Sequence, residues 1–283
     1  MSRNFKIIAV FIATLITLYG CSSIKKEKTT TAKPPHLTTS VLINKMTKAV
    51  DPEGRLNNID TLQCEILYTN VNKRDGTRTE YKYALCESNA PKIVDFQEKE
   101  IISRGYKKFE TIYKILIKNQ KTTIDVVRDG ELLGSDYTED SVINKYKEMA
   151  LAFKDRLFFG LYKDAVSKEI ANKIFSVDGN KCYRISVILK HRFFDDNSDN
   201  IIVYADCSTF LIRKIVGEHS KVFDIEYKDI DGIMLPKKYK ILMEHPFGDD
   251  YGDVFFVKLI QFELNKKMDT SKYIEPECIK HNI

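Results

Sequence analysis

Hydrophobic and polar side chains alternate with a period of two along much of the chain, which is the pattern of strands buried on one face. Residues 61–87 contain two such segments, joined by the turn Arg74-Asp75-Gly76, and predict a β-hairpin. The positions expected to face inward in this hairpin are Leu62, Cys64, Ile66, Tyr68, Tyr81, Tyr83 and Leu85. Further strands are expected at 92–97, 110–118, 121–128, 181–191, 200–206, 209–217, 220–228, 233–243 and 253–264.

Two cysteines make the register of this hairpin informative. A three-residue turn would place Cys64 directly opposite Cys86, close enough for a disulfide. The apolar alternation instead pairs Cys64 with Leu85, and the same register pairs Ile66 with Tyr83. A shift of one residue sends every side chain to the other face, so burial of the apolar set should decide the register. The sequence therefore predicts that Cys64 and Cys86 form no disulfide.

Three segments have the helical spacing of apolar residues instead. The first runs from about Ser40 to Val50, the second from about Ser141 to Phe159, and a third, less regular one from about Tyr162 to Ile174. The apolar stripe of the second helix consists of Val142, Tyr146, Met149, Ala150, Phe153 and Leu157. This stripe suits a lid over a deformable apolar pocket, and it equally suits ordinary core packing against the sheet.

The order of these elements is helix, strands, helices, strands. It contains neither the βαβ alternation of a parallel sheet nor a repeat of fixed period, so it predicts an α+β fold, mainly antiparallel β, with helices gathered on one face. Roughly 245 residues follow position 38, which is enough for one substantial core. A single domain spanning residues 39–283 is expected.

The N-terminus has a different pattern. Basic residues Arg3 and Lys6 precede an uncharged apolar run from Ile7 to Leu18. Twelve residues of helix rise only about 18 Å, too little for a hydrocarbon core of about 30 Å, so residues 1–20 are interpreted as a cleaved signal peptide. The run ends in Leu18-Tyr19-Gly20-Cys21, which resembles the bacterial lipobox. The alternative is a hydrophobic anchor that happens to end in a cysteine.

The lipobox resemblance implies that Cys21 carries a thioether-linked diacylglycerol and that cleavage follows Gly20. Residues 21–38 are polar and rich in Lys and Thr, so they are expected to form a flexible tether. Ser22 rather than aspartate follows the cysteine, which gives no inner-membrane retention signal. The expected location is the bacterial cell envelope, lipid-anchored, at the outer membrane facing the periplasm, and the membrane is the expected partner through Cys21.

Composition and the absence of known motifs bear on three kinds of site: nucleic-acid, metal and catalytic sites. A net charge of +5 with 30% charged residues of both signs indicates a solvated surface and no nucleic-acid partner. Of the six cysteines, none lies in a Cys-x-x-Cys pair, and the acidic segments 195–206 and 249–253 are interpreted as turns, so no metal site is expected. No nucleophile elbow, P-loop or dinucleotide motif occurs, and neither a catalytic residue nor a cofactor is predicted, although a triad built from distant residues is not excluded.

Two stretches resemble the periplasmic lipoprotein-carrier superfamily (LolA, LolB and outer-membrane lipoprotein-sorting proteins). The first is 42–61, which includes Gly54-Arg55-Leu56. The second is 177–243, a run of strand, Asp206 and Thr209 turn, strand, and a strand ending in Asp231-Gly232 before Leu235-Pro236. Together they cover about a third of the chain.

The resemblance implies a strongly curved, unclosed antiparallel half-barrel whose concave face is covered by helices, with an apolar cavity between them for acyl chains. The expected cavity residues are Val142, Tyr146, Met149, Phe153, Leu157, Ile66 and Tyr83. The expected function is that of an anchored, non-enzymatic binder of lipid or another apolar ligand, such as the acyl chains of lipoproteins in an acceptor. The alternative is a structural or protein-interaction lipoprotein without a ligand cavity.

Overall fold

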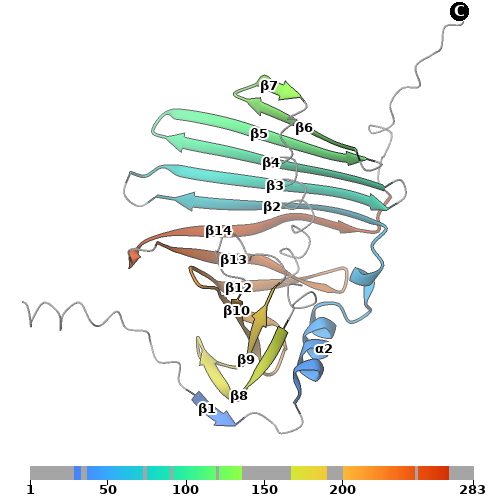
Figure 1. The fold of residues 1–283 in the computed structure, drawn as a ribbon, viewed down its shortest axis with the longest axis vertical. Coiled ribbons are helices and arrows are strands. Elements are labelled where there is room, and N and C mark those ends of the chain that lie inside the picture. Colours follow the sequence, from blue (N-terminus) through green and yellow to red (C-terminus); the bar gives the residue numbers. More distant parts are fainter. Residues whose placement is uncertain are drawn as a thin grey trace, which may run out of the picture.

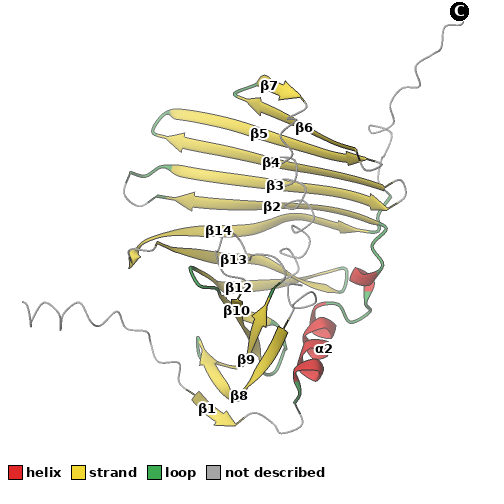
Figure 2. Cartoon of the chain, in the orientation of Figure 1, coloured by secondary structure: helices red, strands yellow, loops and turns green. Residues whose placement is uncertain are grey.

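The computed structural model describes residues 29–32, 37–72, 75–89, 92–118, 121–135, 167–189, 200–245 and 248–267. Within them the chain forms one antiparallel sheet and one α-helix (Figures 1 and 2). In chain order the elements are β1 (Thr29–Ala32), α2 (Thr39–Val50), the 3-10 turn η1 (Arg55–Asn57), β2 (Thr61–Val71), β3 (Arg78–Asn89), β4 (Lys92–Arg104), β5 (Lys107–Lys118), β6 (Lys121–Arg128), β7 (Glu131–Ser135), β8 (Ser167–Val177), β9 (Asn180–Ile188), β10 (Asn200–Asp206), β11 (Ile212–Val216), β12 (Ser220–Ile230), β13 (Ile233–His245) and β14 (Gly248–Leu264).

The fourteen strands follow the order β1-β8-β9-β10-β11-β12-β13-β14-β2-β3-β4-β5-β6-β7. Strands β1 and β7 are the two edges and do not pair with each other, so the sheet is an unclosed half-barrel, as expected. Register shifts in β8 and β12 add extra residues to one strand of a pair, which bends a sheet and increases its twist. Figure 1 shows the result: β2–β5 run across the view, whereas β8–β10 are steeply inclined to them.

One face of the sheet is apolar along nearly its whole width, and this concave face carries the core. Its fully buried residues include Leu62, Phe96, Ile115, Ile185, Val203, Ile215, Val222, Ile241 and Val257, all in one cluster. Helix α2 adds Leu42 and Met46 to that cluster and packs on β13 and β8. Thr38 caps the helix, since its Oγ1 accepts a hydrogen bond from the Val41 N–H at 3.3 Å.

The hairpin register follows the apolar alternation. Cys64 pairs with Leu85, and Ile66 with Tyr83, so the prediction is confirmed. The connecting loop is longer than expected, because Val71 pairs with Arg78. Cys64 is buried in the main core, while Cys86 packs beside Ile93 in a separate cluster on the other face.

A peptide map tests this arrangement directly. Because the two thiols point to opposite faces, we expect non-reducing digestion of the protein, purified from the cells that make it, to give no Cys64–Cys86 linked peptide. Neither cysteine is in a disulfide in this structure. Finding that linked peptide would show that the register is shifted by one residue.

Three elements differ from the expectation. The predicted third helix, Tyr162–Ile174, is wrong from Ser167 onward, because Ser167–Val177 forms strand β8. Its Ile170 and Ile174 are four residues apart, a spacing that fits one face of a helix and also one face of a strand. Strand β7 was not predicted. Part of the predicted tether, Thr29–Ala32, pairs with β8 as β1, so the tether is not wholly free of the sheet.

Candidate functional site

The predicted cavity residues divide into two groups. Ile66 and Tyr83 are cross-strand partners on the concave face, where Ile66 is buried and Tyr83 is partly exposed. Val142, Tyr146, Met149, Phe153 and Leu157 lie outside the described residues, as does Cys21. The structure therefore brings together the two sheet residues and leaves the helical part of the predicted site as a prediction.

Around Tyr83 lies a group of rings that we call the aromatic band: Tyr68, Tyr81, Tyr83, Phe96 and Tyr239. The Tyr68 and Tyr83 ring centroids are 5.2 Å apart, edge to face, and Tyr83 stacks on Phe96 at 6.1 Å. Tyr81 stacks on Tyr83 at 6.4 Å, and the hydroxyl oxygens of Tyr68 and Tyr239 are 3.5 Å apart. Such contacts orient the rings and each contributes roughly 0.5–1.5 kcal/mol beyond burial.

The aromatic band is covered unevenly. Phe96 and Tyr239 are buried, whereas Tyr68, Tyr81 and Tyr83 are only partly buried. Sequence reasoning found Tyr83 through its alternation and missed the band as a unit. The missing information was the cross-strand register, which aligns residues of β13, β14, β2, β3 and β4 on one face.

Polar groups border the band toward the end of the sheet that carries the β2–β3 and β4–β5 turns. Cross-strand pairing places Glu98 beside Tyr83 and Glu100 beside Tyr81, both partly buried. Asn70 follows Tyr68 on the same face of β2 and is 9% exposed, and its Oδ1 is buried without a hydrogen-bond partner in the described structure. A buried acceptor left unpaired costs about 1–3 kcal/mol. The concave face thus changes from apolar to polar along the strands.

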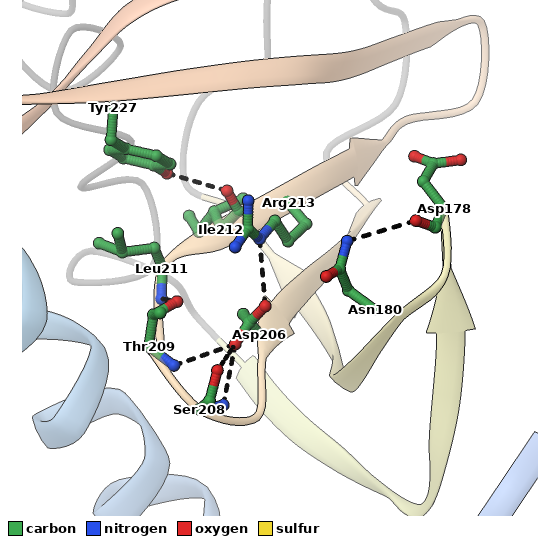
Figure 3. A network of polar contacts seen from close by, with 9 residues as sticks. All are labelled: Asp178, Asn180, Asp206, Ser208, Thr209, Leu211, Ile212, Arg213 and Tyr227. Atoms are coloured by element: carbon green, nitrogen blue, oxygen red, sulfur yellow. Dashed lines mark hydrogen bonds and ion pairs between the residues drawn. The ribbon is translucent and has the colours of Figure 1, made fainter.

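A second polar site is the β10–β11 turn, where Asp206 is 4% exposed (Figure 3). Its Oδ1 accepts hydrogen bonds from the Ser208 hydroxyl, the Ser208 N–H at 2.8 Å and the Thr209 N–H at 3.0 Å. The Arg213 Nε donates to Oδ2 at 3.2 Å. Burial alone would raise the pKa of Asp206, but these hydrogen bonds and the Arg213 charge outweigh it and bring the pKa to about 2.

This network accounts for the Asp206 and Thr209 part of the carrier-like motif. It holds a tight turn in which Phe210 adopts a left-handed conformation with φ of 59°, unusual for a bulky residue. The Phe210 ring stacks on Tyr183 at 6.2 Å, and Lys45 of α2 lies 4.8 Å from its centroid. The turn therefore helps to dock α2. The carboxylate of Asp206, the last residue of the acidic segment 195–206, is engaged in the hydrogen bonds and the ion pair of this turn.

The two carrier-like stretches meet in space. The β12–β13 turn is Asp231-Gly232, with φ of 54° and 78°, the geometry of a two-residue hairpin turn. A Cβ on Gly232 would lie 2.8 Å from the Arg55 Nη2, so the guanidinium rests directly on the glycine. The motif around Gly54-Arg55 is thus packed on the Asp-Gly turn of the second motif.

The cysteine thiols beside the β10–β11 turn, those of Cys182 and Cys207, are poor nucleophiles. Burial raises the pKa of Cys182 to about 12, and burial also raises the pKa of Cys207. A reactive cysteine needs a lowered pKa, because the thiolate is the nucleophile. Among the described residues, no group of three or more His, Cys, Asp or Glu is placed to hold a metal ion.

The opposite face of the sheet has a groove of about 620 Å³. It lies between the β8–β9 turn and the outer side of β12, β13, β14 and β2. Its charged lining residues are Asp178, Arg213, Asp224, Glu226, Lys238, Lys240 and Lys258. Lys240 pairs with Asp224 at 2.6 Å and Lys238 with Glu226 at 3.4 Å, so much of the groove's charge is neutralised. Its lining also includes the apolar residues Leu67, Val177 and Phe256.

Comparison with known proteins gives likenesses in structure only. No family model matches the chain, and no curated protein sequence matches it. Within the described residues, no helix is long and apolar enough to cross a membrane.

Several solved structures are similar to it. A LolA superfamily protein from Nitrosomonas europaea matches with a TM-score of 0.47 and 13% identity over 84% of this chain and 100% of that one. A DUF1329 family protein from Desulfovibrio piger matches with a TM-score of 0.44 and 12% identity, over 82% of this chain and 97% of that one. A putative outer membrane lipoprotein-sorting protein domain from Vibrio parahaemolyticus matches with a TM-score of 0.41 and 10% identity, over 82% of this chain and 94% of that one. Such identities assign no role to any residue here.

Proposed function

We propose that this chain is a membrane-anchored lipoprotein of the cell envelope that binds the acyl chain of an amphipathic lipid over the aromatic band. One observation carries the proposal: the partly exposed rings of Tyr68, Tyr81 and Tyr83 lie in the middle of the core-forming face. Large rings exposed in the hollow of a curved sheet are what an apolar ligand site requires.

The polar border of the aromatic band supports an amphipathic ligand, which has an apolar end and a polar end. An acyl chain would lie along the apolar side of the band, toward Phe96 and Ile66. Its head group would lie toward Asn70, whose buried Oδ1 has no donor in the described structure. A hydrogen-bond donor on the ligand would relieve the cost of that unpaired acceptor.

We propose a cover for this site from the sequence. Helix α2 packs on the β8 and β13 side of the face, and in Figure 1 it lies well away from β3–β6. Strands β7 and β8 lie near opposite ends of the strand order, and the residues between them in the sequence include the predicted helix Ser141–Phe159. That helix, with Met149 and Phe153 on its apolar stripe, is the proposed lid.

Displacement of a fluorescent fatty acid from the delipidated full-length protein tests the proposal. Burying eight to ten methylenes contributes about 6–8 kcal/mol before ordering costs, so we expect micromolar affinity. Replacing Tyr83 with alanine removes the central ring of the band and should weaken binding by about 10-fold, the loss expected for one partly buried ring.

The matched control is Tyr106→Ala, since Tyr106 is a fully exposed tyrosine outside the concave face. We expect this variant to bind the fatty acid like the wild type, and circular dichroism should show both variants folded. If the folded wild type shows no saturable displacement up to high micromolar ligand, the binding proposal fails.

A further inference from the structure

The turn between β4 and β5 exposes an aromatic side chain that the fold does not use. Arg104 pairs with Lys107, so the turn consists of Gly105 and Tyr106 alone. Gly105 has a φ of 58°, and the common two-residue hairpin turns require a positive φ at their first central residue. Tyr106 then lies at the outermost point of the hairpin and is 109% exposed, more than any other large hydrophobic residue in the described structure.

The surroundings of Tyr106 are apolar and basic. Phe109, three residues further, is 51% exposed, and Val71 and Leu132 near the same end of the sheet are 48% and 60% exposed. The residues flanking the turn are Arg104, Lys107 and Lys108, all exposed. We call Arg104 to Phe109 the β4–β5 tip; it holds three positive charges and no acid.

Two acidic residues lie near the tip: Glu110, which pairs with Lys99 at 2.8 Å, and Asp75 of the β2–β3 turn, on which the charge of Arg104 acts. The hydrogen bond from the Thr77 N–H lowers the pKa of Asp75, and the charge of Arg104 adds to this effect. Lys107 and Lys108 appear in no ion pair of the described structure. The tip therefore keeps most of its positive charge available for a partner.

Folding gives no reason for this composition. A two-residue turn needs a glycine at its first position, and any polar residue serves at the second. An exposed tyrosine and phenylalanine at that place gain no burial, and exposed aromatics on a sheet end promote association. The combination has to be explained by what the tip contacts.

We infer that the β4–β5 tip is a membrane-contact element, in which Tyr106 and Phe109 enter the interface of an anionic phospholipid surface while Lys107 and Lys108 bind its head groups. Tyrosine favours the membrane interface, and lysine side chains extend from an apolar stem to the head groups. The hairpin satisfies its own backbone hydrogen bonds up to Arg104 and Lys107, so it enters the interface without exposing unpaired groups.

The size of the tip favours a lipid surface over a protein partner. A stable protein interface buries about 800 Å² on each side, far more than two residues at the end of a hairpin provide. A membrane accepts a small protrusion, because the lipids close around it. This contact is independent of the lipid on Cys21 and of the concave site, and it would hold the domain in a defined orientation on the membrane.

The chain contains no tryptophan, which permits a site-specific measurement. Tyr106→Trp in the full-length protein provides a single fluorophore at the tip. On vesicles of phosphatidylcholine and phosphatidylglycerol (7:3) we expect its emission to shift to the blue and to be quenched by lipids brominated near the head group. On phosphatidylcholine alone both effects should be much smaller, and high salt should reduce them, because it screens the attraction.

Two controls make the result specific. Phe256→Trp places the fluorophore on the outer face of β14, where the native side chain is 51% exposed, and its emission should not respond to vesicles. Charge reversal at Lys107 and Lys108 should lower the occupancy of the membrane-bound tip by at least about 30-fold, since loss of each lysine removes about fivefold and each new acidic side chain is repelled by the anionic surface. Reversal at the exposed Lys181 and Lys228 changes the net charge equally and should leave the tip signal intact.

The inference is overturned if protein that co-floats with the anionic vesicles shows the same tip emission as in buffer. It is also overturned if reversal at Lys181 and Lys228 abolishes the signal as fully as reversal at Lys107 and Lys108, because the attraction would then be a property of the whole surface. Neither outcome bears on fatty-acid displacement at the concave face.

Discussion

Replacing Cys21 with serine is expected to abolish acylation of the protein. Serine offers no thiol for the thioether bond, and the lipobox-like sequence Leu18 to Cys21 then lacks its acceptor. Incorporation of labelled fatty acid should fall to background, and cleavage after Gly20 should cease. Because each buried methylene contributes about 0.8 kcal/mol, two or three acyl chains hold a protein on a membrane far more firmly than one.

The control for a general effect of thiol loss is Cys86→Ser, since Cys86 is a partly exposed cysteine of the folded domain. It should be acylated like the wild type. Mass spectrometry of the N-terminal peptide decides the matter: a wild-type peptide without acyl mass would refute the lipid anchor on Cys21.

Asp206→Asn is expected to lower the free energy of unfolding by about 2 kcal/mol at pH 7. The carboxylate accepts hydrogen bonds from the Ser208 and Thr209 amides and pairs with Arg213, which brings its pKa from 3.8 to about 2. A shift of one pKa unit corresponds to about 1.4 kcal/mol of preference for the charged form in the folded state. Asparagine keeps an acceptor oxygen but loses the charge. Urea unfolding of both proteins measures the difference.

The pH dependence of this difference has a definite sign. The pKa is lower in the folded state than in the unfolded state, so the stabilisation is fully present above about pH 4 and is lost as the pH falls through about 2. The wild type should therefore approach the stability of Asp206→Asn in acid. Asp60→Asn, at an exposed aspartate just before β2, should cost little at any pH. A difference that persists unchanged at pH 2 would contradict the electrostatic account.

Period-two alternation was sufficient for most of the sheet. It located β2, β3, β6, β9, β10, β12 and β13 and chose the β2–β3 register, because burying the apolar residues of a half-buried strand outweighs the preference of a short turn. It failed at β8, where Ile170 and Ile174 satisfy both periods and a bulge interrupts the pairing. It also missed β1 and β7, short edge strands without a periodic pattern of their own.

The candidate site also has a part that the sequence predicts and a part that only the tertiary structure shows. Sequence alone determined which residues of each strand are apolar, and so placed Ile66 and Tyr83 on the inner face. The cleavable leader and the acylated Cys21 are also predictions of local sequence, since they depend on contiguous residues. Only the tertiary structure decided which rings meet, because Tyr239 and Tyr68 are 171 residues apart and come together through the pairing of β13, β14 and β2. The exposure of Tyr106 could not be predicted from the sequence either. An aromatic residue is buried only where the fold packs another surface against it, and no surface of the described structure packs against Tyr106 at the tip of this hairpin.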